Sequence, residues 1–430
     1  MEQSEIKGEQ IQGLLQFIEK SPCACLAAAQ MGTELEQAGY LRLYEEDEWQ
    51  LEPGGRYFVV RNDSSLIAFH LPKSVVRGFH MISAHSDSPS FKLKESPELR
   101  VEEAYTRLNV EKYGGMILST WMDRPLSIAG RVSVWKEDQG LHPVTKLVHL
   151  DRDLLVIPNL AIHMQPKLNQ GFEYNVQTDL LPLFSDGKEG QSVKALVAEA
   201  AGVEEEEILG SDLFLYCREK GRILGAGEEF ILSPRLDDLE CVYCALQAML
   251  QSEPSHYINV MAVFDHEEVG STTRNGAGSS FLEEVLQGIC ASMGQTGQSY
   301  RRLLADSFMI SADNAHGVHP NHPEKADPVN RPYLNKGIVI KYHGGQKYAT
   351  DSVSAAVMKH ICREAGVSCQ SYANRSDIAG GTTLGNIAAS RVSVPTVDIG
   401  FAQLAMHSAM ETAGARDVGD MIKVMKHFFS

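Results

Sequence analysis

The chain has 430 residues, of which 43% are hydrophobic and 22% are charged, and its formal net charge is −17. This composition is typical of a globular protein with room for two domains. The acidic balance argues against nucleic acid and against anionic membrane surfaces as partners, because both bind basic faces. No apolar run approaches the roughly 18 residues that suggest a membrane span, and the N-terminus lacks a signal-peptide pattern.

The eight cysteines lie mostly in apolar segments and lack the rhythm of a disulfide scaffold, which favours a cytoplasmic location with reduced thiols. Cys241 and Cys244 form a lone CxxC pair. Their neighbours are apolar at helical spacing, and a second pair with zinc-site spacing is missing. We therefore predict that both cysteines pack inside the protein rather than bind zinc.

The predicted elements change character along the chain. Residues 9–21 read as an amphipathic helix, and three strands are predicted between residues 56 and 85. Residues 95–230 contain short β-like runs joined by Pro- and Gly-rich connections. We expect this segment to form an inserted β-rich domain.

From residue 231 onward, strands alternate with helices. The segment EEFILSPRL, just before Asp237, is a predicted strand, and further strands are predicted at residues 257–264, 307–312, 336–342 and 392–400. Alternation of this kind predicts an α/β fold with a mixed, mostly parallel sheet and flanking helices. Residues 1–94 and 231–430 would together form this domain.

Side chains of the metal-ligand type follow several predicted strands. In α/β proteins ligands gather at the carboxyl ends of the strands, so these side chains should meet. A single His or Asp at a strand end is more often a cap, but the recurrence at five strand ends predicts a metal site. The residues are His85, Asp87, Asp237, Asp238, Asp265, His266, Glu267, Glu268, Asp313 and His407.

The mixture of imidazole and carboxylate without thiolate fits zinc, with cobalt or manganese as substitutes. The ligands outnumber the needs of one four-coordinate ion, which favours two ions about 3.5–4 Å apart, bridged by a carboxylate. One of Glu267 and Glu268 would ligate, and the other would serve as a base. Asp87, two residues after His85, is suited to orient that imidazole.

Five segments resemble motifs of the aspartyl aminopeptidase family, and the resemblance runs through essentially the whole chain. They read SAHSDSPSFKLK, SPRLDDL, FDHEEVGS, SADNAHGVHPNHPEK and LAMHSAMETAG. The resemblance implies a metallo-exopeptidase with two metal ions per subunit. It also implies that the inserted domain mediates dimerisation, and that dimers assemble into a dodecamer whose active sites face an inner chamber.

The resemblance also implies residue roles. Asp237 matches the bridging carboxylate. His85 and Asp313 would complete one metal site, and Glu268 and His407 the other.

Glu267 would be the general base. The Asp237–Asp238 bond is expected to be a cis peptide, as is common at this motif in related enzymes.

Three further residues match positions near the substrate. His163 resembles a histidine that reaches the active site of the neighbouring subunit. Lys341 resembles a lysine near the pocket for the substrate side chain. His319 is expected to contact substrate, whereas His316 and His322 are assigned structural roles because nearby prolines prevent a shared helical face.

These roles predict an aminopeptidase that releases an N-terminal Asp or Glu from peptides with a free amino terminus. The net charge of −17 would repel such peptides, but salt screens that repulsion beyond about 8 Å. The ammonium of Lys341 would then attract the acidic side chain locally. Alternatives are an aminopeptidase for neutral residues and a di-metal deacylase or carboxypeptidase. A non-catalytic metal-binding or assembly protein is disfavoured because it needs no spare base at Glu267.

Overall fold

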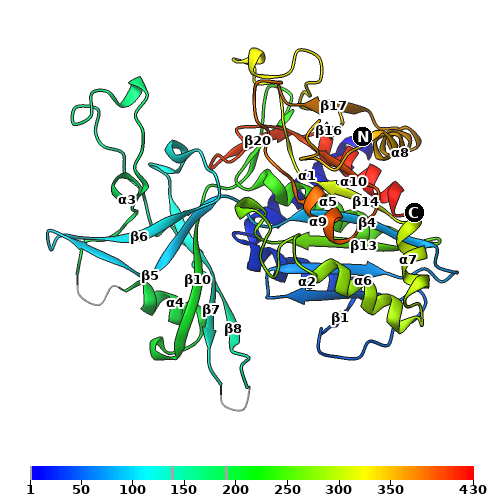
Figure 1. Ribbon diagram of the computed structural model, residues 1–430. Coiled ribbons are helices and arrows are strands. Elements are labelled where there is room, and N and C mark those ends of the chain that lie inside the picture. Colours follow the sequence, from blue (N-terminus) through cyan, green and yellow to red (C-terminus); the bar gives the residue numbers. More distant parts are fainter. Residues whose placement is uncertain (1, 137–139, 189–191) are drawn as a thin grey trace. The chain divides into compact units, whose positions relative to one another are not determined.

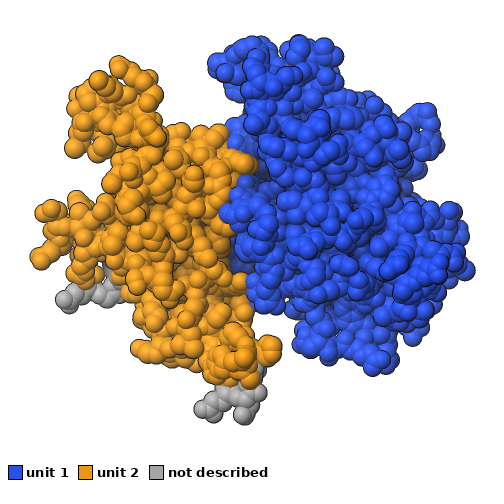
Figure 2. Space-filling model, in the orientation of Figure 1, with its two compact units in different colours: residues 1–87, 221–406, 411–430 blue, residues 88–220, 407–410 orange. Residues whose placement is uncertain are grey.

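The computed structural model describes residues 2–136, 140–188 and 192–430 (Figure 1). The chain divides into two compact units (Figure 2). Unit 1 comprises residues 1–87, 221–406 and 411–430, and unit 2 comprises residues 88–220 and 407–410. The sequence predicts the two junctions at 94/95 and 230/231, which are seven and ten residues later than the junctions in the structure.

Unit 1 contains a nine-stranded mixed sheet within the described residues. Its strands are, in spatial order, β1 (Leu41–Leu43), β2 (Arg56–Arg61), β3 (Ser65–His70), β13 (Tyr257–Phe264), β4 (Gly78–His85), β14 (Phe308–Ala312), β18 (Thr396–Gly400), β16 (Ile338–Tyr342) and β17 (Cys369–Ala373). The four central strands β13, β4, β14 and β18 run parallel. Strands β3 and β16 pair antiparallel with the two sides of this parallel block.

The central strands are buried on both faces, which explains their nearly continuous apolar sequences. In β4, Ile82 and Ala84 face one hydrophobic cluster, whereas Phe79 and Met81 face the other. Helices α1 (Glu2–Lys20), α2 (Ala24–Gln37), α5 (Leu236–Gln251), α8 (Ser352–Glu364) and α10 (Asp417–Phe428) contribute to the first cluster. Helices α6 (Phe281–Ser292), α7 (Gln298–Ala305) and α9 (Leu384–Arg391) contribute to the second. The sequence prediction of an α/β fold with a mixed sheet and flanking helices is confirmed.

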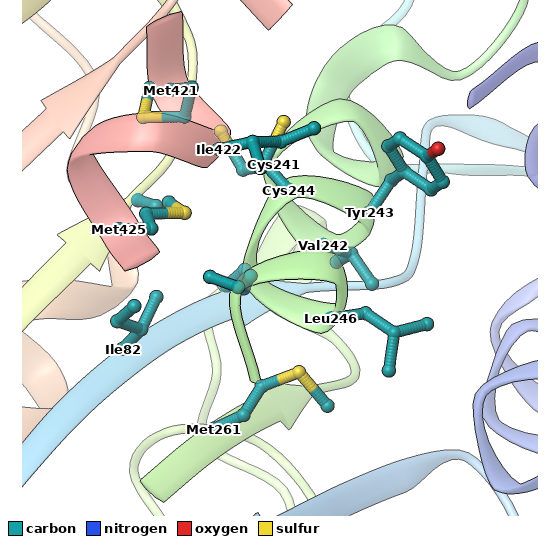
Figure 3. Packing of buried hydrophobic residues seen from close by; sticks show 14 of the residues in the cluster. Ile82, Cys241, Val242, Tyr243, Cys244, Leu246, Met261, Met421, Ile422 and Met425 are labelled. Carbon is teal, nitrogen blue, oxygen red and sulfur yellow. The ribbon is translucent and has the colours of Figure 1, made fainter. Parts of the chain in front are cut away.

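Helix α5 is packed into this core (Figure 3). Cys241 and Cys244 are fully buried on it, among Ile82 of β4, Met261 of β13 and Met421 of α10. The prediction that this CxxC pair serves packing is confirmed.

A second, five-stranded sheet lies within unit 1. Its strands are β11 (Arg222–Leu224), β12 (Phe230–Ser233), β20 (Glu411–Gly414), β19 (Ala402–Leu404) and β15 (Ala315–His316). The strand predicted before Asp237 is β12. It pairs antiparallel with β20, so it belongs to this smaller sheet and not to the large one.

Among the described residues of unit 2, six strands form an antiparallel sheet. Its strands are, in spatial order, β8 (Val144–His149), β7 (Leu126–Val134), β10 (Ile208–Cys217), β5 (Ser90–Val101), β6 (Tyr105–Tyr113) and β9 (Leu183–Ser185). The described part of unit 2 also contains the helices α3 (Val176–Asp179) and α4 (Val193–Ala201). Among the residues described in both units, no helix is long and apolar enough to cross a membrane.

Candidate metal centre

Several candidate ligands follow the parallel strands β4, β13 and β14, and the register of these strands brings their carboxyl ends together. Strand β4 ends at His85, which lies opposite Phe264 at the end of β13. Strand β14 pairs with β4 on the other side, with Ser311 opposite Ser83. Two residues further along each strand, Asp313 therefore comes level with His85. The carboxyl ends of β13, β4 and β14 thus meet as predicted (Figure 1).

His85 lies at the centre of the cluster. Its Nε2 is 3.4 Å from Oδ1 of Asp237 and 4.0 Å from Oδ1 of Asp313. These three residues offer ligand atoms within 4.8 Å of one another, and His85 forms a second such group with Glu267 and Glu268. The two groups overlap at one imidazole, which is only 1% exposed.

Asp87 connects the imidazole to the segment that carries the paired glutamates. Its Oδ1 is 3.4 Å from Nδ1 of His85, and its backbone oxygen is 3.0 Å from the same nitrogen. The backbone N–H groups of Glu267 and Glu268 donate to its two carboxylate oxygens, at 3.1 Å each. Asp87 therefore fixes both the imidazole and the short 3₁₀ helix η4 (Glu267–Val269).

The start of α5 supplies Asp237 to the cluster. The Asp237–Asp238 peptide bond is cis, which confirms the expectation from the family motif. The backbone N–H of Asp237 donates to Oε2 of Glu411 at 3.0 Å. Oδ2 of Asp238 accepts a hydrogen bond from the backbone N–H of His85 at 3.2 Å. Both hydrogen bonds fix the backbone that carries the candidate ligands Asp237 and His85.

Glu411 is a buried residue of the site that the sequence analysis did not assign. It lies in the motif LAMHSAMETAG, four residues after His407. The sequence carries a signal for this role, because Glu411 lies among small and apolar residues. An acid buried in such a segment is costly unless it has a polar partner.

Burial and the neighbouring charges together shift the pKa values in the cluster. Burial raises the pKa of Glu267 well above its ordinary value, and the nearby Asp313 and Glu268 raise it further. Burial likewise raises the pKa of Asp238. For His85, burial lowers the pKa, but the carboxylates of Asp237 and Asp87 outweigh it and raise the pKa overall. So many buried acids favour a cation among them, and the imidazole and carboxylate donors suit zinc.

Lys341 brings a buried ammonium to the same cluster. Its side chain is 1% exposed, and its Nζ lies 3.5 Å from Oδ2 of Asp313. The ammonium also donates to the backbone oxygen of Asn314 at 3.3 Å and lies 5.2 Å from the ring centre of Tyr348. In this structure it therefore contacts a candidate metal ligand directly.

Three other predicted residues, His407, His163 and His319, lie in turns or loops. His407 has a left-handed backbone, with φ of 66°, and belongs to the short segment grouped with unit 2. Its backbone oxygen accepts a hydrogen bond from the N–H of Ile117 at 2.9 Å. His163 lies in an exposed turn of unit 2. His319 is exposed in unit 1, where its Nδ1 accepts a hydrogen bond from the N–H of Asn321 at 3.2 Å.

Comparison with known proteins places this centre in a family. Residues 17–429 match the family model described as "Aminopeptidase I zinc metalloprotease (M18)". A protein of Clostridium acetobutylicum, named "Probable M18 family aminopeptidase 2", is 46% identical over 423 residues, which are 97% of this chain and 98% of that protein.

Solved structures agree with this match. A chain of the Ape4 and Nbr1 complex superposes with a TM-score of 0.94 at 36% identity, over 99% of this chain and 86% of that chain. A subunit of the S. cerevesiae mApe1 dodecamer superposes with a TM-score of 0.85 at 28% identity, over 100% of this chain and 97% of that chain. The chain therefore belongs to the M18 family of zinc metalloproteases, and it is a metallo-aminopeptidase.

Proposed function

We propose that this aminopeptidase releases an N-terminal Asp or Glu from peptides, with Glu267 as general base. Two zinc ions would be held by the five ligands that the family motifs select, namely His85, Asp237, Glu268, Asp313 and His407. The observation that carries this proposal is the pair of ligand groups that share His85, because one group offers Asp237 and Asp313 and the other offers both glutamates.

The residues of the centre would divide the chemistry among them. When bound, the zinc ions supply an activated water and polarise the scissile carbonyl. Glu267 would take a proton from that water and pass it to the leaving amine. Asp87 would keep the imidazole of His85 and the backbone of Glu267 in place, since it contacts both.

Assembly would complete the site. The mApe1 neighbour is a dodecamer, and we extend this state to the present chain, with unit 2 as the dimerisation domain. His163 is exposed on unit 2, as a residue that reaches into a neighbouring subunit must be. There it would donate a hydrogen bond to the developing oxyanion.

The preference for acidic residues would come from Lys341. Its ammonium is excluded from water, where attraction to a carboxylate is stronger than at the surface. In the structure the ammonium is paired with Asp313, so a substrate carboxylate would share it with this ligand. A neutral-residue aminopeptidase is the alternative if that pairing leaves no attraction for substrate.

The preference is tested by kcat/KM on matched peptides that begin with Asp, Glu, Leu or Ala. Wild type is expected to favour Asp and Glu. In Lys341→Met, the ratio of kcat/KM for acidic peptides to kcat/KM for neutral peptides should fall about tenfold or more. Lys359→Met is the matched control, because Lys359 is exposed on α8. A peptide with a blocked amino terminus should not be cleaved. A wild type that favours Leu, or a Lys341→Met variant that keeps its acidic preference, would contradict the assignment.

A further inference from the structure

Two cysteines at the start of α2 form a close thiol pair outside the metal centre. Cys23 is the N-cap residue of the helix, and Cys25 lies in its first turn. Their sulfur atoms are 3.3 Å apart. A disulfide bond is about 2.05 Å long, so the sulfurs need to approach by only about 1.3 Å to bond.

The closeness of the pair depends on the cap conformation. Side chains two positions apart within a helix point in nearly opposite directions and do not meet. Cys23 is not helical: its φ of −154° and ψ of 168° are those of extended backbone. The extended N-cap turns its side chain back over the first turn, where it meets Cys25. The sequence CAC followed by a helix therefore creates a dithiol that the helix interior would not allow.

The two thiols differ in their access to solvent. Cys25 is buried, with 6% exposure, whereas Cys23 is partly exposed. The pKa of Cys23 is lowered, chiefly because the thiol of Cys25 hydrogen-bonds to its sulfur, and the charge of Arg235 lowers it further. The guanidinium of Arg235 is held nearby by its hydrogen bond of 3.0 Å to the backbone oxygen of Ile18, at the end of α1. An accessible thiol with a buried partner is the arrangement of an attacking and a resolving cysteine.

We propose that Cys23 and Cys25 are a reactive dithiol that low-molecular-weight disulfides convert reversibly into an intrachain disulfide. The thiolate of Cys23 attacks one sulfur of the small disulfide, forms a mixed disulfide and releases one small thiolate. Cys25 then loses its proton and attacks the sulfur of Cys23, which releases the second small thiolate. The protein loses two electrons and two protons, and the small disulfide is reduced to two thiols.

The other cysteines provide the comparison. Cys241, Cys244 and Cys290 are buried, and burial raises the pKa of each of these thiols. Cys369 is exposed, and its pKa is about 6, chiefly because Cys362 hydrogen-bonds to it. Cys369 would react with the same reagents, so the experiment uses Cys369→Ser as its background.

The folded Cys369→Ser protein is treated with oxidised glutathione, and the peptide that contains both cysteines is followed by mass spectrometry. In this background the peptide is expected to lose the mass of two hydrogens, and dithiothreitol should restore it. Adding Cys25→Ser should stop the reaction at a glutathione adduct on Cys23. Adding Cys23→Ser instead leaves Cys25 as the single thiol of the pair. Cys25 should then react with glutathione disulfide roughly tenfold or more slowly than Cys23 reacts in the Cys25→Ser variant. Repeating the treatment on the denatured protein and following the same peptide gives the reactivity of the two thiols in the absence of the fold.

Three results would overturn the proposal. One is a glutathione adduct on Cys23 that persists while Cys25 is present, because the resolving step would then be absent. Another is equal reactivity of Cys23 and Cys25 in the folded protein. The third is no modification at all under conditions in which the denatured chain reacts.

Discussion

At the scale of single residues, the main question is how the neighbouring acids Glu267 and Glu268 take different proposed roles. Both lie in one group with His85, and both donate their backbone N–H groups to Asp87. Their backbones are therefore held alike, so the proposed division into a ligand and a base rests on their side chains alone. Substitution by glutamine tests this difference because it keeps the shape and removes the charge.

Glu267→Gln is expected to bind zinc as wild type does and to lose about 10²–10⁴ in kcat, because it would remove the proposed base and none of the five proposed ligands. Glu268→Gln is the matched comparison and should lose bound zinc as well as activity. Metal content by elemental analysis and kcat on one peptide substrate measure both effects. If Glu267→Gln loses the metal and Glu268→Gln keeps it, the two roles are reversed.

At the scale of elements, Asp87 joins the end of β4 to the short helix η4. One carboxylate receives two backbone N–H groups from η4 and approaches the imidazole of His85. Such support around a metal ligand matters for affinity because it fixes the orientation of the ligand before the metal binds.

Asp87→Ala is expected to lower zinc affinity or activity by about 10–100-fold, because His85 and η4 would lose their shared acceptor. Zinc dissociation measured with a competing chelator, together with kcat, gives the size of the loss. Asp306→Ala serves as the control, since Asp306 lies away from the ligand groups and pairs with Arg77 at 3.3 Å. An Asp87→Ala protein with wild-type metal affinity and activity would show that the contact with η4 has no part in the chemistry.

At the scale of the whole molecule, the proposed role of His163 makes activity depend on assembly. His163 lies on unit 2, whereas the ligand groups around His85 belong to unit 1. A subunit that lacks His163 would then disable the site of its neighbour rather than its own.

Co-expression of His163→Ala subunits with Glu267→Gln subunits tests this dependence. Each single variant should be nearly inactive, and the mixture should regain about one quarter of wild-type activity, because random pairing leaves one site in four intact. Tags on the two subunits allow mixed assemblies to be isolated before the assay. Mixed assemblies without activity would exclude a role for His163 in the neighbouring site.

Much of the fold follows from local sequence pattern. The apolar runs of β4, β13 and β14 predict strands buried on both faces, and both of their faces do contact hydrophobic clusters. The alternation of strands and helices after residue 231 predicts the α/β class because a parallel strand needs a crossover. Local pattern did not predict the five-stranded sheet, since β12 and β20 pair across nearly 180 residues of chain.

The sequence alone determined which residue types stand at the strand ends, and therefore that a cation site was expected there. It also determined the family, through five ordered motifs. The tertiary structure alone decided that Asp87 holds η4, that Glu411 supports Asp237, and that Lys341 is buried against Asp313. The physical reason is that each of these contacts joins residues far apart in sequence, and only strand pairing and packing determine which distant residues meet.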